Sequence, residues 1–329
     1  ELETMWNYAE NGASAGPQNL VNLSARLGLK IGAYADLFLL FASVNLVEVT
    51  LADITLLDLS YNAPQVKPVL AEKQGDVLHL NVGDRAAKRK YMDILDGGEE
   101  FILSGSGGNV KVTSGEWSHT YSGISKVIGN AGKGKDVLDA SGLSDVTVEL
   151  SGGDGDDKII SGSGAATLSG GAGKDLLDAR LALAGSTLLG GEGADKMYGS
   201  AFDDVLRGGA GDDKIIAGAG DDRIEGGEGV DSLKGEAGDD VYEFADDFGL
   251  DRFRDNEGEC TLDFSSVTAN LSGSYGPRGV KLAIDAANEF KSGRSDIAKL
   301  ILGQGNDELS ITGFAERTFE LGDAGGGDL

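Results

Sequence analysis

The sequence is poor in cysteine, proline and histidine, and each shortage excludes a class of protein. The single cysteine, Cys260, excludes an intrachain disulfide framework. Four prolines among 329 residues argue against a proline-rich linker or a collagen-like chain, although glycine is abundant at 53 residues. Two histidines, His79 and His119, leave little material for histidine-based catalysis or a zinc centre.

Positive charge and long apolar runs are also scarce. The chain has 28 Lys and Arg against 55 Asp and Glu, which gives a net charge of -27. Because nucleic acid and anionic lipid would repel such a chain, we expect neither as a partner. The longest uncharged apolar run covers residues 37–47, whereas a membrane-spanning helix needs about 20 residues. We therefore predict no membrane span and interpret this run as a buried strand.

The sequence does contain a nine-residue repeat between residues 152 and 243. The successive units read GGDGDDKII, SGSGAATLS, GGAGKDLLD, the eleven-residue ARLALAGSTLL, GGEGADKMY, GSAFDDVLR, GGAGDDKII, AGAGDDRIE, GGEGVDSLK and GEAGDDVYE. Their common pattern is G-G-x-G-x-D-x-U-x, where U is a large apolar residue. Five units match at every defined position, so the pattern is specific, and generic acidic turns would not keep the eighth position apolar as well.

Each position of the unit has a physical role. The first six residues predict a turn, in which glycine allows positive φ and close backbone approach. The last three predict a short strand, and because side chains alternate on a strand, U points inward. The U residues are expected to stack as a narrow apolar core: Ile159, Leu168, Leu177, Leu188, Met197, Leu206, Ile215, Ile224, Leu233 and Tyr242.

This pattern resembles the calcium-binding nonapeptide repeat of the RTX family. The resemblance implies an all-β fold, a calcium-bound parallel β-roll or β-helix solenoid with β-rich flanks, in which two units make one rung of 18 residues. It also implies that each Ca²⁺ lies between two turns on the same side. Sixth-position carboxylates and glycine-loop carbonyls would hold the ion. The glycines carried over are Gly153, Gly155, Gly171, Gly173, Gly191, Gly193, Gly209, Gly211, Gly227 and Gly229.

The two-unit rung sorts the sixth positions into two columns. The first column contains Asp157, Asp175, Asp195, Asp213 and Asp231, and the second contains Ala166, Ser186, Asp204, Asp222 and Asp240. We expect about six ions: four between successive residues of the first column, and two in the second, between 204 and 222 and between 222 and 240. The fifth-position acids Asp156, Asp212, Asp221 and Asp239 are interpreted as solvated surface charge.

The acidic repeat is expected to need its metal. Residues 152–243 carry 20 acidic and 8 basic residues, a net charge of -12. Carboxylates stacked at about 4.8 Å repel one another, and a core one side chain wide cannot offset this repulsion and the entropy of the glycines. We therefore predict that the segment is expanded without calcium and orders outside the cell, where modules of this kind bind Ca²⁺ at about 10⁻⁴–10⁻³ M.

The flanks are predicted to be β segments that cover the ends of the roll. The expected division is residues 1–75 as an N-terminal β-rich cap or assembly surface, 76–130 as a β flank, 131–243 as the roll, and 244–329 as a C-terminal β flank. DVLHL (76–80) resembles CTLDF (260–264), and each is followed by a degenerate repeat, so a β module is inferred to be duplicated. The degenerate repeats KGKDVL (133–138) and GQGNDEL (303–309) make Asp136 and Asp307 further candidate calcium ligands.

No catalytic constellation is found. GASAG at 12–16 fits G-x-S-x-G, but Ser14 lacks the strand and helix that such a nucleophile needs. The H-E-x-x-H motif is absent, His79 and His119 are interpreted as strand or surface residues, and Cys260 as a small buried residue. The chain is therefore predicted not to be an enzyme.

The predicted function is structural. We expect a secreted or cell-surface calcium-binding repeat protein that is part of an adhesin, a surface layer or an extracellular assembly, and the resemblance implies type I secretion. Its partners would be calcium, further copies of itself or cell-surface polysaccharide. The alternatives are the noncatalytic RTX portion of a secreted enzyme and a carbohydrate-active β-helix enzyme. A pore-forming toxin would show long apolar helices, which this sequence lacks.

Overall fold

A computed structural model describes residues 68–89, 97–255, 257–276, 279–285, 288–292, 297–311 and 320–322. The chain divides into two compact units, of which the second, residues 69–88 and 95–329, holds nearly all of these residues. The strands expected before residue 68, and Ser14, lie outside the described residues.

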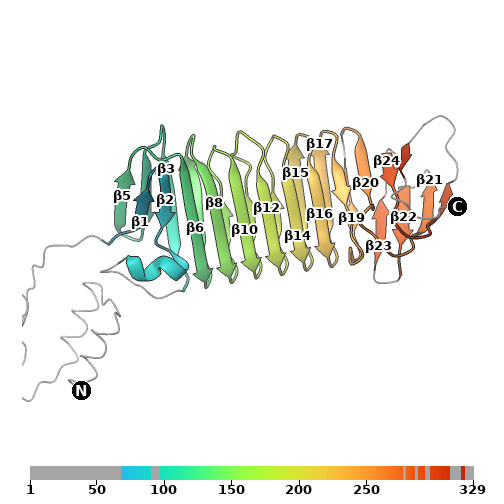
Figure 1. Cartoon of the computed structure of the whole chain (residues 1–329), viewed down its shortest axis with the longest axis horizontal. Helices are drawn as coiled ribbons and strands as arrows, with labels where there is room; N and C mark the ends of the chain where they lie inside the picture. The colour runs from blue at the N-terminus through green and yellow to red at the C-terminus, as the bar shows by residue number, and fades with distance from the viewer. Residues whose placement is uncertain are drawn as a thin grey trace, which may run out of the picture. The chain divides into compact units, whose positions relative to one another are not determined.

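The second unit is a parallel β-solenoid of about seven turns, which confirms the predicted fold class. Its strands stand side by side in a long row (Figure 1). One sheet contains β6 (Lys126–Lys133), β8 (Thr147–Asp154), β10 (Ala166–Ala172), β12 (Thr187–Glu192), β14 (Val205–Ala210), β16 (Arg223–Glu228), β18 (Val241–Glu243) and β20 (Cys260–Asp263). The other contains β7 (Val137–Leu143), β9 (Lys158–Ile160), β11 (Leu176–Asp178), β13 (Lys196–Tyr198), β15 (Lys214–Ala219), β17 (Ser232–Ala237) and β19 (Arg252–Phe253).

The register places equivalent positions of the repeat on top of one another. Leu188 lies beside Leu206, and Met197 lies beside Ile215, each pair in neighbouring parallel strands. All ten U residues are at most 1% exposed, as the alternation of the strands predicts. The core is therefore a single apolar stack enclosed by the two sheets.

The sheets continue without interruption into both flanks. The N-terminal flank adds β1 (Ala71–Gln74), β2 (Val77–Leu80), the 3-10 helix η1 (Gly83–Lys88), β3 (Glu100–Gly105), β4 (Val110–Ser114) and β5 (Trp117–Tyr121). The C-terminal flank adds β21 (Ser272–Gly276), β22 (Gly279–Ala283), β23 (Glu289–Ser292), β24 (Ile297–Ile301), β25 (Glu308–Ile311) and β26 (Glu320–Gly322). Strand β6 crosses the boundary expected at residues 130 and 131, so roll and flank share one sheet.

The two flanks share one connectivity, in agreement with the duplication inferred from sequence. In the first, β2 pairs parallel with β6, and β7 pairs parallel with β3, which begins the antiparallel set β3–β4–β5. In the second, β20 pairs parallel with β24, and β25 pairs parallel with β21, which begins the antiparallel set β21–β22–β23. Antiparallel strands therefore adjoin the roll at both ends.

Aromatic side chains fill the core where the repeat ends. The rings of Phe244 and Phe264 stack at 4.3 Å between centroids, and Phe248 and Phe290 contact Phe244 edge to face. These four side chains are at most 3% exposed. They give the C-terminal end of the solenoid a wide apolar core that needs no metal. No helix among the described residues is long and apolar enough to cross a membrane.

Candidate metal centre

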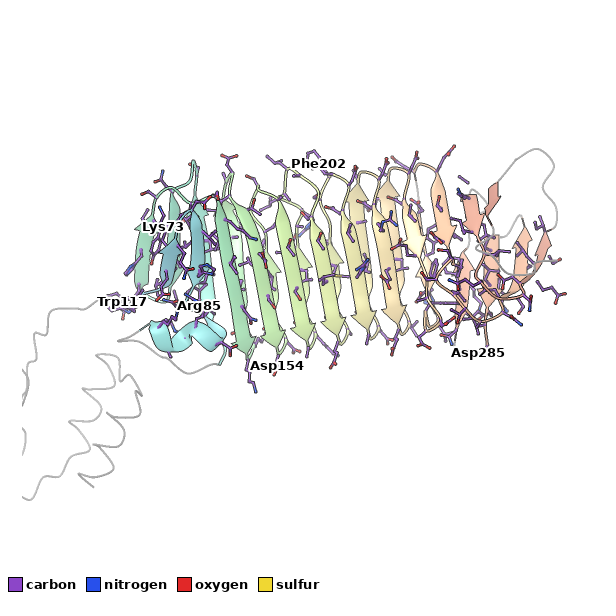
Figure 2. The ribbon with its side chains drawn as sticks, viewed as in Figure 1. Lys73, Arg85, Trp117, Asp154, Phe202 and Asp285 are labelled. Carbon is purple, nitrogen blue, oxygen red and sulfur yellow. The ribbon has the colours of Figure 1, made fainter. Side chains whose placement is uncertain are left out.

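The sixth-position aspartates form two stacked columns, as the repeat predicts. The turns that carry the columns lie on opposite long edges of the solenoid. Figure 2 labels Asp154, in the turn before Asp157, on one edge, and Phe202, in the turn before Asp204, on the other. The eight predicted aspartates of the columns are at most 3% exposed, so their carboxylates belong to the interior of the turns.

One oxygen of each buried carboxylate fastens a rung to the next. In the first column, Oδ1 accepts the backbone N–H of the equivalent residue one rung earlier, at 2.7–2.8 Å. These bonds run from Asp136 to Asp157, Asp157 to Asp175, Asp175 to Asp195, Asp195 to Asp213 and Asp213 to Asp231. In the second column, Asp204 donates to Asp222 at 2.8 Å and Asp222 to Asp240 at 2.9 Å. This ladder fixes the orientation of every carboxylate.

The second oxygen of these carboxylates is buried without a hydrogen-bond partner among the described residues. The atoms are Oδ2 of Asp157, Asp175, Asp195, Asp213, Asp222, Asp231 and Asp240. A buried anionic oxygen without compensation is costly, because it loses its water and gains nothing in return. A row of such atoms therefore fits a bound cation better than an empty turn.

The first glycine of the unit provides the space for this oxygen. A Cβ on Gly208 would lie 2.2 Å from Oδ2 of Asp213, closer than any real contact. The same overlap, at 1.9–2.5 Å, would occur for Gly152 with Asp157, Gly170 with Asp175, Gly190 with Asp195, Gly226 with Asp231 and Gly235 with Asp240. Among the units that contain these aspartates, only the unit of Asp222 departs from this arrangement, because Ala217 occupies its first position. In each of these turns, the carboxylate oxygen thus occupies the space that the Cβ of a larger residue would fill.

The ten glycines named as candidate ligands hold the backbone of neighbouring rungs in close contact. Their φ values lie between 101° and 136°, which L side chains rarely adopt. A Cβ on Gly211 would lie 2.0 Å from the carbonyl oxygen of Gly193 one rung earlier. The backbones of successive turns are therefore closely stacked, and the role of these glycines as ligands stays a prediction. Among the described residues no three His, Cys, Asp or Glu side chains converge on one point, so a coordination shell would also need other oxygen ligands, such as backbone carbonyls or water.

The electrostatics of the columns agree with this geometry. Burial raises the pKa of the aspartates far above the usual value near 4, to about 6 for Asp157 and Asp195, about 7 for Asp213 and Asp240, and about 8 for Asp222. The hydrogen bonds of the ladder act in the opposite direction, and the stacked like charges add to the rise in pKa. Without a cation, the fold favours protonated carboxyls.

The second column carries carboxylates over only part of its length, as predicted. Val148 and Ala166 occupy sixth positions in its early rungs, and both are buried. Ser186 occupies the next rung and donates its N–H to Oδ1 of Asp204. The other oxygen of Asp204 accepts the N–H of Ser200, so it is satisfied within the chain. Sequence reasoning missed this contact, which depends on how the turn of one unit folds.

Sequence reasoning also missed one member of the first column. Asp251 is 1% exposed, and its Oδ1 accepts the N–H of Asp231 at 3.1 Å. Its Oδ2 has no hydrogen-bond partner among the described residues. The signal was present as the G-x-D-x-U pattern of GLDRF at 249–253. The irregular VYEFADDF before it hides the nine-residue spacing.

The fifth-position aspartates are exposed, as expected, but they do more than face solvent. Oδ1 of Asp156 accepts the N–H of Lys174 at 3.0 Å, and Oδ1 of Asp212 accepts that of Val230 at 3.0 Å. Asp221 accepts from Asp239 at 2.9 Å. They therefore also form a second, outer ladder between rungs, a role that their interpretation as solvated surface charge did not include.

The remaining candidate residues lie in or beside the flanks. Oδ1 of Asp136 accepts the N–H of Glu99 at 2.6 Å, and Oδ1 of Asp307 accepts that of Leu271 at 2.8 Å. Both carboxylates are buried and hold equivalent positions after β6 and β24. His79 and His119 lie on β2 and β5, and Cys260 is buried at the start of β20, as predicted for each.

Comparison with known families settles the origin of the repeat. A family model described as the RTX calcium-binding nonapeptide repeat (4 copies) matches residues 150–181, 189–224 and 216–247. Residues 150–247 are RTX calcium-binding repeats. No curated protein and no solved structure gives a significant match to the chain. The RTX repeats thus account for the two columns of carboxylates and for the rungs that carry them.

Proposed function

We propose that this chain acts outside the cell as a calcium-dependent structural module whose RTX roll folds when calcium binds. The observation that carries the proposal is the row of buried Oδ2 atoms, each oriented by the ladder and without a hydrogen-bond partner among the described residues. Cations placed along this row would remove the repulsion between stacked carboxylates. Extracellular calcium, at about 10⁻³ M, is the hard cation that suits such oxygen ligands.

The ions would lie between neighbouring turns of one side. In the first column they would lie between successive residues from Asp157 to Asp231, and the buried Asp251 adds a turn to this column. In the second column they would lie between Asp204 and Asp222, and between Asp222 and Asp240. The carbonyls of the turn glycines would complete each shell.

We further propose a role in an adhesin, a surface layer or another extracellular assembly, after type I secretion. Among the described residues, the 14-stranded sheet ends in β25 on one side and β5 on the other, and edge strands of this kind support pairing with a second copy. We propose no catalytic role for the chain.

A calcium titration of the full chain tests the proposal. Far-ultraviolet circular dichroism should show a cooperative gain of β signal near millimolar Ca²⁺, and Mg²⁺ at the same concentration should fail, because it demands a smaller octahedral shell. Light scattering in the same samples would show whether the folded chain assembles. A β signal that is unchanged by EDTA would exclude the proposed calcium dependence.

Binding of an extracellular polysaccharide is a second candidate function, supported by a groove on the solenoid. The groove has a volume of about 500 Å³, and its lining includes Arg180, Tyr198, Ser200, Glu236 and Glu257. The guanidinium of Arg180 lies 4.7 Å from the centre of the Tyr198 ring and pairs with the carboxylate of Asp178. The groove crosses several rungs, which suits a linear polymer with many hydroxyls. Glycan-array binding that is lost in Arg180→Ala would support this function, and an array without any hit would exclude it.

A further inference from the structure

The last aspartate of the second column lies beside an unusual tyrosine. Tyr242 occupies the eighth position, where the other nine units have Ile, Leu or Met. Its side chain is fully buried, and its ring packs edge to face on Phe253 at 4.3 Å between centroids. The hydroxyl donates no hydrogen bond among the described residues, and the backbone of Gly235 interacts with its oxygen. A buried phenol hydroxyl usually finds a partner, so its place in an otherwise aliphatic stack needs a reason.

The hydroxyl of Tyr242 and a carboxylate oxygen of Asp240 point to the same place. A Cβ on Gly235 would lie 1.9 Å from Oδ2 of Asp240 and 2.5 Å from the hydroxyl oxygen of Tyr242. Asp240 is fully buried, its Oδ1 accepts from Asp222, and its Oδ2 has no hydrogen-bond partner in the described part of the chain. Two buried oxygens thus converge on one glycine, each with lone pairs to offer.

The next rung departs from the repeat in a compensating way. Strand register places Thr261 beside Val241 and Glu257 beside Ala237, so Asp255 follows Gly235 and Cys260 follows Asp240 along the column. The sixth position has therefore lost its carboxylate to Cys260. The first position, glycine in most units, has gained one in Asp255, which is 4% exposed. Compared with the regular repeat, the carboxylate of this unit stands five residues earlier in the sequence, on the same side of the solenoid.

Asp255 lies beside the same pair of residues. The strand register aligns Asp255 with Gly235, on which Oδ2 of Asp240 and the hydroxyl of Tyr242 converge. Three buried oxygen-bearing side chains therefore lie in one electrostatic neighbourhood, and two of them are anionic when ionised. Such a group is unfavourable unless a cation joins it.

We propose that Asp240, Asp255 and Tyr242 form an additional calcium site at the C-terminal end of the second column. It differs from the regular RTX sites, because its ligands come from the first, sixth and eighth positions of the repeat and include a phenol oxygen. All three ligands are hard oxygens, which favours Ca²⁺. The inference rests on the proposed calcium binding and adds an ion to it. The ion would close the column where the aromatic core begins.

Counting calcium ions on the full chain by native mass spectrometry tests the site. Asp255→Gly restores the glycine of the repeat and removes one ligand, so it should bind one ion fewer than the wild type. The double variant Asp255→Gly with Cys260→Asp returns the carboxylate to the sixth position and should regain that ion. Glu259→Gly, an exposed acid of the same unit, is the matched control and should keep the wild-type number.

A second variant keeps the test decisive if Asp255→Gly does not fold. Tyr242→Phe preserves the ring and its contact with Phe253 but removes one ligand. We expect it to bind one of its calcium ions at least tenfold more weakly than the wild type does. If Tyr242→Phe and Asp255→Gly both keep the wild-type number and affinity, the inference is overturned while calcium binding by the regular sites stands. A wild-type chain that binds no calcium would instead overturn the proposed function itself.

Discussion

The two oxygens of the Asp175 carboxylate lie in different environments, and one of them contacts the backbone of Asp157. Its Oδ1 accepts the backbone N–H of Asp157 at 2.7 Å, and its Oδ2 is buried without a hydrogen-bond partner among the described residues. The hydrogen bond to Oδ1 needs only an oxygen acceptor. A cation bound at Oδ2 is instead stabilised by the negative charge of the carboxylate. A substitution that separates the two requirements can therefore show which one the fold depends on.

Asp175→Asn makes this separation. The amide keeps an oxygen for the N–H of Asp157 and nearly the same volume, but it removes the charge. In calcium we expect a loss of about 3 kcal/mol in the free energy of unfolding, because a buried ion pair is broken from one side. In EDTA, where the roll is expected to be expanded, we expect no further loss of β signal, since one repulsive charge has gone. Chemical denaturation in calcium measures the first effect, and circular dichroism in EDTA measures the second. Asp156→Asn, at the exposed neighbouring position, should change the stability in calcium by no more than about 0.5 kcal/mol.

Gly211→Ala probes the close approach of neighbouring rungs. Gly211 has a φ of 127°, and a Cβ there would lie 2.0 Å from the carbonyl oxygen of Gly193. Backbone strain and this clash together should cost about 2–4 kcal/mol of stability in calcium. Gly97→Ala is the control, because nothing lies within 4 Å of its Cβ position. Equal melting temperatures for the two variants would contradict the packing described for the turns.

The raised pKa values predict how stability depends on pH without calcium. An aspartate whose pKa is raised on folding binds its proton more tightly in the folded chain. Its contribution is fully present below the unfolded pKa near 4 and is lost as the pH rises through the folded pKa, about 6 for Asp157 and about 8 for Asp222. In EDTA, the β signal and the melting temperature should therefore fall between pH 4 and pH 8.

Calcium should reverse this dependence. Protons and calcium compete for the same carboxylates, so the affinity for calcium should rise as the pH increases from 5 to 8. Calorimetric titration at several pH values measures this directly. A calcium affinity that does not change over this interval would show that the buried carboxylates are not the ligands.

Much of the fold could be predicted from the sequence because one nine-residue pattern specifies turn, strand and core together. The burial of Ile159 or Met197 follows from strand alternation alone, and the columns follow from the rung length. Contacts between rungs and within turns could not be predicted in the same way. Two examples are the hydrogen bond from the Lys174 N–H to Asp156 and the one from the Ser200 N–H to Asp204. Both depend on strand register and on turn conformation, which the residue types alone do not reveal.

The candidate site could be predicted only where the pattern stays regular. Asp251 follows an irregular stretch, so its place in the first column appears only once β17 and β19 are seen side by side. In the sequence, Cys260 in place of the repeat's aspartate and Asp255 in place of its glycine look like two unrelated deviations from the repeat. Their link depends on the alignment of β18 with β20, which brings both positions to the end of the second column.

Glu236, at the second position of its repeat unit, has a strained backbone, and restoring glycine there tests this strain. Glu236 has a φ of 85°, at a position where most units have glycine. Its carboxylate pairs with Lys234, but a half-exposed ion pair adds little to stability. Glu236→Gly should therefore raise the free energy of unfolding in calcium by about 1 kcal/mol. Glu192→Gly, at an exposed position without positive φ, should instead lower it by about 0.5–1 kcal/mol.

The strain at Glu236 also bears on the groove, because this side chain is part of its lining. Backbone strain that persists against an easily available glycine concentrates at sites where a side chain is needed. If the groove binds polysaccharide, Glu236→Gly should gain stability and lose glycan binding in the same protein. A variant that gains stability and keeps its glycan binding would show that Glu236 does not contact the polymer. A variant that gains no stability would show that the ion pair with Lys234 offsets the strain.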